Sequence, residues 1–220
     1  MNPLADALVT PLTAREDTVL IRQDAREISG VDLYRLTGQI ANVLLNHGVE
    51  PGHRVAMQTE KTVEALGLYL ACLRTGAVFL PLNTAYTPTE MEYFINNSEP
   101  TVVVCDPKSE AILSKLTKLN GIKLLTLDNF GKGSLNEEIW TAETAFTDVA
   151  RSPEDLAAIL YTSGTTGRSK GAMLNHDNLL SNADSLCEVW RFTPNDGLLH
   201  SLPIFHVHGL FVAINVLLRA

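Results

Sequence analysis

The chain has 220 residues, and 17 Lys and Arg stand against 25 Asp and Glu, so its formal net charge is −8. Apolar residues make up 45% and charged residues 19%, a globular composition that excludes a disordered chain or a coiled coil. The pI near 5.2 excludes broad binding to a nucleic-acid backbone, which needs a basic face. We therefore expect no nucleic-acid partner, and any phosphate site must be local.

Strand-like and helix-like segments alternate along the first half of the chain. Two short strands are expected within 18–29, around a turn at Asp24. Thr87 and Glu90 form a capping box that opens a helix, with Pro88 at its first position. The other expected strands are 54–58, 77–82, 101–105 and 123–127, and the expected helices are 31–46, 63–74, 88–96 and 109–119.

A looser stretch at 128–148, rich in Gly and acidic residues, predicts a seam between two parts of the chain. We expect a first α/β sub-module over 1–150 and the start of a second over 151–220. The second part contains a strand at 156–161, a glycine-rich loop and a helix at 177–190. Strands that alternate with helices predict an α/β fold with a layered, mainly parallel sheet. The final residues are apolar without a polar tail, which predicts a truncation within an element.

Compartment signals point to the cytoplasm. The three cysteines, Cys72, Cys105 and Cys187, form no CxxC pair and predict buried free thiols in a reducing compartment. The N-terminus lacks the basic and apolar regions of a leader peptide. Residues 197–218 carry no Asp, Glu, Lys or Arg, but their histidines and Pro203 argue against a membrane span. We expect a buried strand, a loop and the start of a helix there.

The sequence YTSGTTGRSKG at 161–171 follows an apolar strand and concentrates glycines, hydroxyl groups and two cations. Glycines allow close backbone approach to an anion, hydroxyls add donors without bulk, and Lys170 adds a positive charge. This is the chemistry of a polyphosphate site, although the spacing matches neither a Walker A loop nor G-x-G-x-x-G. The alternative is an ordinary turn between a strand and a helix, where Gly, Ser and Thr are common.

This stretch resembles the phosphate loop of the adenylate-forming superfamily, which includes the acyl-CoA synthetases. Most relatives have Pro where this chain has Ser169. The sequence LPIFHVHG at 202–209 resembles the family's Pro-x-Phe-His-x-x-Gly segment. Within the superfamily, four stretches are similar to malonyl-CoA synthetases, namely 59–87, 102–107, 161–174 and 190–213.

The resemblance implies a ligase that converts malonate, ATP and coenzyme A into malonyl-CoA, AMP and pyrophosphate through a malonyl-adenylate. It implies a catalytic role for Lys170 and a substrate-binding role for His206. It also implies that the ligands of Mg²⁺ lie mostly outside this chain, in a missing portion that includes a C-terminal domain. The 220-residue chain alone is therefore expected to be inactive. The expected ATP-binding residues are Thr162, Ser163, Gly164, Thr165, Thr166, Gly167, Arg168, Ser169 and Lys170.

The two histidines near the end of the chain, and the function as a whole, also have alternative interpretations. On a strand, His206 and His208 would share one face and form a candidate metal pair, but no third ligand stands at a useful spacing. We therefore expect no metal site within the chain. Two alternative functions are a CoA ligase for another short carboxylate or an aryl acid, and a non-catalytic module that binds a nucleotide or CoA.

Overall fold

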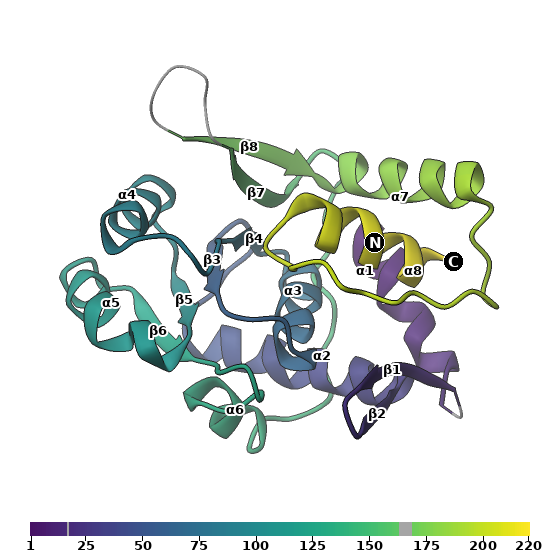
Figure 1. Cartoon of the computed structure of the whole chain (residues 1–220), viewed down its shortest axis with the longest axis horizontal. Helices are drawn as coiled ribbons and strands as arrows, with labels where there is room; N and C mark the ends of the chain where they lie inside the picture. The colour runs from purple at the N-terminus through teal and green to yellow at the C-terminus, as the bar shows by residue number, and fades with distance from the viewer. Residues whose placement is uncertain (17, 163–168) are drawn as a thin grey trace.

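The computed structural model describes residues 1–16, 18–162 and 169–220. Within these residues a six-stranded sheet has the order β6-β5-β3-β4-β7-β8 (Figure 1). The strands from β6 through β7 run parallel, and β8 is antiparallel to β7. The six strands are β3 (Arg54–Gln58), β4 (Val78–Pro81), β5 (Val102–Cys105), β6 (Lys123–Thr126), β7 (Leu156–Thr162) and β8 (Lys170–Asn175).

Helices cover both faces of the sheet, and the side chains of the inner strands alternate between them. Val55 and Met57 join the larger core with α2 and α3, whereas Ala56 joins the smaller core with α4 and α5. A parallel sheet buried on both faces confirms the layered α/β fold that the sequence predicts. The helices are α1 (Pro3–Leu8), α2 (Gly30–Asn46), α3 (Val63–Thr75), α4 (Pro88–Ser98), α5 (Pro107–Leu119), α6 (Ser134–Ile139), α7 (His176–Trp190) and α8 (Asn215–Arg219).

Local sequence signals fix several element boundaries as expected. Strands β1 (Val19–Gln23) and β2 (Arg26–Ser29) form a separate antiparallel hairpin whose turn contains Asp24 at φ 52°. At the start of α4, the Glu90 backbone N–H donates to Thr87 Oγ1 over 3.3 Å, and the Thr87 backbone N–H donates to the Glu90 carboxylate over 2.8 Å. This confirms the capping box.

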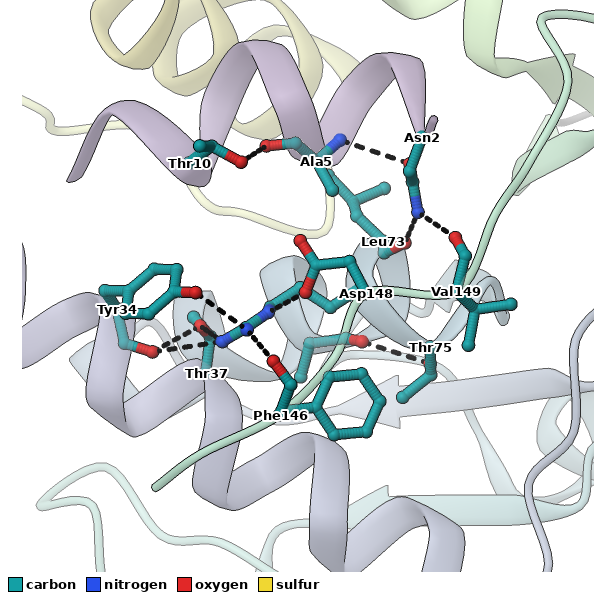
Figure 2. Close-up of polar contacts among 12 residues, drawn as sticks. Asn2, Ala5, Thr10, Tyr34, Thr37, Leu73, Thr75, Phe146, Asp148 and Val149 are labelled. Carbon is teal, nitrogen blue, oxygen red and sulfur yellow. Dashed lines mark hydrogen bonds and ion pairs between the residues drawn. The ribbon is translucent and has the colours of Figure 1, made fainter. Parts of the chain in front are cut away.

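A buried arginine connects the α2–α3 layer to the chain that leads into β7. Arg74, on α3, is fully buried and its Nε lies 2.6 Å from Asp148 Oδ1. Its other nitrogens donate to the Phe146 carbonyl, the Thr37 hydroxyl, and the carbonyl and hydroxyl oxygens of Tyr34. Figure 2 shows Tyr34, Thr37, Phe146 and Asp148 arranged around the arginine side chain. The approach to β7 is thus held against α3.

The predicted seam at 128–148 contains α6 and also lies against α2. The Gln39 side-chain amide donates to the carbonyl of Ile139, and the Asn42 amide donates to the carbonyls of Glu143 and Ala145. Strand β7, beyond the seam, pairs with β4 in the same sheet. The division into sub-modules at 150 and 151 stays a prediction.

The structure departs from the sequence-based expectations in three places. The glycine-rich stretch leads into strand β8 instead of directly into a helix, so it is part of a hairpin. The strand expected within 197–218 is wrong, because the described backbone there is irregular until a π-helix at His208–Ile214, which continues into α8. His206 and His208 therefore do not share a strand face. None of the described helices combines the length and the apolar character needed to cross a bilayer.

Candidate nucleotide-binding site

The β7–β8 hairpin carries the stems of the predicted phosphate loop. Thr162 at the end of β7 pairs in register with Lys170 at the start of β8, and both side chains are exposed. These two predicted site residues therefore lie opposite each other at the mouth of the loop. Ser169 is also described and is half-buried. The predicted residues Ser163, Gly164, Thr165, Thr166, Gly167 and Arg168 lie outside the described residues.

Helix α4 packs against both stems of the loop. The Tyr93 hydroxyl donates to the Ser169 carbonyl over 2.7 Å, and the Tyr161 hydroxyl donates to Asn97 Oδ1 over 2.6 Å. The ring of Phe94 packs against both tyrosine rings, with its centroid 4.4 Å from that of Tyr161 and 5.4 Å from that of Tyr93. Burial raises the pKa of the Tyr161 phenol, which keeps this hydroxyl protonated as a donor at neutral pH.

Thr162, at the carboxyl end of β7, lies at the same edge of the sheet as the carboxyl ends of the other parallel strands, because β7 runs parallel to β4. The chain passes from β3 to β4 on one side and from β5 to β6 on the other, so β3 and β5 flank a topological switch point. Ligands of open α/β sheets bind at such points. A cavity of about 370 Å³ opens there. Its lining residues lie at or just after the ends of three strands: Gln58 and Glu60 (β3), Thr84 and Ala85 (β4), and Asp106, Lys108 and Ser109 (β5).

The segment that carries His206 is held by a lysine from the β3–α3 loop. Lys61 Nζ donates to the carbonyls of His200 over 2.5 Å and Leu202 over 3.2 Å. The His200 ring places Nδ1 3.2 Å from Lys61 Nζ and Nε2 2.8 Å from the Gly209 carbonyl. A neutral ring with its proton on Nε2 satisfies both contacts. Burial lowers the pKa of His200, in agreement with this neutral form.

His206 itself is exposed in the turn before the π-helix. Its ring packs against Phe205 at a centroid distance of 5.3 Å, and its carbonyl accepts from the Leu210 backbone N–H over 3.0 Å. Among the described residues, no hydrogen bond or ring contact joins His206 to the hairpin stems. Within the same ranges, no group of three His, Cys, Asp or Glu could hold a metal ion.

Sequence reasoning missed the residues that support the site. Tyr93 and Asn97 are four residues apart on one capped helix, so they share a helix face, and this spacing is the available sequence signal. Lys61 lies three residues after the end of β3, and its partner His200 is 139 residues away in the chain, so no local sequence signal identifies this contact.

Comparison with known proteins places this architecture in a family. A family model described as AMP-binding enzyme matches residues 11–220. A mitochondrial malonate–CoA ligase of Xenopus laevis is 30% identical over 220 residues, which cover 95% of this chain and 38% of that protein. An oxalate–CoA ligase of Arabidopsis thaliana is 32% identical over 172 residues, which cover 76% of this chain and 33% of that protein.

The crystal structure of ATP-bound MatB from Rhodopseudomonas palustris is similar over the whole chain. The TM-score is 0.92 at 51% sequence identity, and the match covers 100% of this chain and 44% of that one. The present chain thus spans less than half the length of these relatives. Because the family model matches nearly the whole chain and the fold is shared, the chain belongs to the AMP-binding enzyme family of adenylate-forming ligases.

Proposed function

We propose that the gene product containing residues 1–220 is an ATP-dependent malonate–CoA ligase. A malonate carboxylate oxygen attacks the α-phosphorus of ATP, which releases pyrophosphate and forms malonyl-adenylate. The thiol of coenzyme A then attacks the acyl carbon, loses its proton and releases AMP. The observation that carries this proposal is the 51% identity to MatB over the whole chain, together with a malonate–CoA ligase among the relatives.

In this proposal the hairpin loop holds the β- and γ-phosphates of ATP. Thr162 and Lys170 are paired across the two strands at the mouth of the loop, so their side chains leave the hairpin on the same face. The ammonium of Lys170 offsets the negative charge that grows on pyrophosphate as it departs, which makes Lys170 catalytic. The predicted loop residues from Ser163 to Ser169 supply backbone and hydroxyl donors to the same phosphates.

The proposal assigns His206 to the wall of the acid pocket, and the exposure of its ring next to Phe205 supports this assignment. Lys61 and His200 fix the segment from which His206 projects. We also propose that Mg²⁺ accompanies ATP with ligands mostly beyond these residues, and that the 220-residue chain alone does not turn over. A cytoplasmic location is supported by the three free cysteines.

Oxalate is a second candidate substrate to be tested, because one relative is an oxalate–CoA ligase. Oxalate and malonate are both short dicarboxylates, so the same loop chemistry would serve either one. The difference would lie in the acid pocket, where one methylene changes the distance between the two carboxylates.

The test is AMP release by the whole gene product with Mg-ATP and coenzyme A. Malonate, oxalate, methylmalonate and acetate are compared as the acid. We expect malonate to give the highest kcat/KM. Faster release with oxalate or acetate would reject malonate and retain the adenylate-forming ligase. A folded protein that binds ATP but releases no AMP with any acid would favour a non-catalytic nucleotide-binding module.

A further inference from the structure

Among the described residues, helix α4 makes a side-chain hydrogen bond to each stem of the phosphate-loop hairpin. Tyr93 reaches the stem that follows the loop, at the Ser169 carbonyl. Asn97 accepts from Tyr161, on the stem that precedes the loop. The donor and acceptor residues of α4 are one helical turn apart, so a single rigid helix face spans both stems.

The contact with Ser169 has a direct consequence for Lys170. The Ser169 carbonyl and the Lys170 backbone N–H belong to the same planar peptide group. When Tyr93 fixes the direction of that carbonyl, it also fixes the direction from which the Lys170 chain leaves the loop. Lys170 pairs in register with Thr162, so the orientation of both residues at the loop mouth depends on this peptide plane.

The second contact fixes the other stem through its side chain. The Tyr161 ring packs on Phe94 with a centroid distance of 4.4 Å and lies 6.2 Å from the Tyr93 ring. On the opposite strand, a Cβ added at Gly171 would lie 3.6 Å from the Tyr161 ring and 2.9 Å from Ile159. The absence of a side chain at Gly171 therefore lets β8 lie close to β7 beside the Tyr161 ring.

From these contacts we propose that Tyr93 and Asn97 are positioning residues for ATP. Through them, α4 acts as a brace that holds the two stems of the phosphate loop at the spacing needed to bind the β- and γ-phosphates. Neither residue is proposed to touch ATP itself. This inference rests on the proposed nucleotide site, but it does not depend on which acid is activated. The brace connects a helix of the first 150 residues to the loop in the remainder.

The test measures dissociation constants of Mg-ATP and AMP for the whole gene product. Tyr93→Phe removes the hydroxyl that donates to the Ser169 carbonyl and keeps the ring, and Asn97→Ala removes the acceptor of the Tyr161 hydroxyl. Each should weaken ATP binding about fivefold, since a hydrogen bond contributes on the order of 1 kcal/mol. AMP lacks the β- and γ-phosphates, so its affinity should stay within twofold. The matched control is Tyr86→Phe, because the Tyr86 ring packs on Phe94 in the same cluster and its hydroxyl makes no hydrogen bond among the described residues.

A further variant tests whether Asn97 acts through Tyr161. Tyr161→Phe should weaken ATP binding as much as Asn97→Ala does. The double variant Tyr161→Phe/Asn97→Ala should bind ATP with the same affinity as either single variant, because all three lack the same hydrogen bond. Unchanged ATP affinity in Tyr93→Phe and Asn97→Ala would overturn the brace. Equal losses for ATP and AMP would also overturn it, since they would indicate general damage to the fold.

The outcomes separate the brace from the proposed function. A wild-type protein that binds ATP and loses affinity in the brace variants, but does not activate malonate, supports the brace and rejects the substrate. A wild-type protein that does not bind ATP overturns both.

Discussion

Asp148→Ala should destabilise the protein strongly, because it leaves a buried guanidinium without its counter-ion. The side chain of Arg74 is 0% exposed, and that of Asp148 is 20% exposed. The two side chains approach to 2.6 Å. The variant keeps the neutral acceptors around Arg74 but removes the negative charge that offsets burial of the cation.

The magnitude follows from the partners that stay in place. Removing one member of a buried ion pair costs about 3–5 kcal/mol. Arg74 still donates to the Phe146 carbonyl over 2.9 Å and to the Thr37 hydroxyl over 3.0 Å, and it stacks 4.4 Å above the Tyr34 ring. These contacts and the partial exposure of Asp148 favour the lower end, about 3 kcal/mol. For a domain of this size, that loss corresponds to a Tm decrease of roughly 6–12 °C.

Scanning calorimetry of the wild type and the variant measures this loss. The control is Glu27→Ala, which breaks the ion pair with Arg22 at 2.9 Å, where the two side chains are 58% and 74% exposed. An exposed pair contributes less than about 1 kcal/mol, so Glu27→Ala should lower the Tm by no more than about 4 °C. Similar Tm values for the Asp148→Ala variant and the wild type would refute the assignment of Asp148 as the counter-ion of Arg74.

Three further predictions concern other parts of the fold. Burial lowers the pKa of His176 to about 4, so stability should fall as pH drops from the unfolded pKa near 6.5 toward 4, by about 2 kcal/mol between pH 7 and 5. In urea titrations at both pH values, His176→Gln should lack this loss; an identical pH dependence would contradict the neutral buried ring. Gly209→Ala should cost about 3 kcal/mol in urea unfolding, because its Cβ would lie 2.0 Å from the Pro203 carbonyl oxygen, whereas Gly197→Ala, with open space around it, should cost less than about 1 kcal/mol. Lys61→Met should speed amide hydrogen exchange in residues 200–209, since it removes the ammonium group that donates to two carbonyls there. Unchanged exchange would show that Lys61 does not stabilise this segment.

Much of the sheet was predictable because its inner strands carry an unambiguous local signal. The run TVVVC at 101–105 is β-branched and apolar, and it forms β5 with every residue from Val102 to Cys105 buried. The capping box at Thr87 was equally explicit, since its two hydrogen bonds depend on residues three positions apart. In these places the local preference and the tertiary environment agree.

Strand β8 and the π-helix were not predictable for physical reasons. Strand β8 is exposed over its first four residues, so it lacks the apolar pattern that identifies a buried strand, and only its pairing with β7 defines it. The π-helix at His208–Ile214 has no sequence periodicity of its own that distinguishes it from an α-helix.

The candidate site was predictable in its chemistry but not in its support. The hydroxyl, glycine and lysine pattern at 161–171 indicates a polyphosphate site by composition alone. The hydrogen bond from Tyr93 to Ser169 joins residues 76 positions apart, and the one from Lys61 to His200 joins residues 139 apart. Such contacts depend on how the layers pack, which one sequence does not disclose.

We propose that the hairpin loop of this chain serves to adenylate a carboxylate. The most direct test is malonate-dependent exchange of labelled pyrophosphate into ATP by the whole gene product, without coenzyme A. We predict exchange in the wild type and a loss of about 100-fold or more in Lys170→Ala, the range for removal of one charge-stabilising group. Full exchange in Lys170→Ala would reject the catalytic role of this lysine, and no exchange by the folded wild type with any of the acids would reject adenylation by this protein.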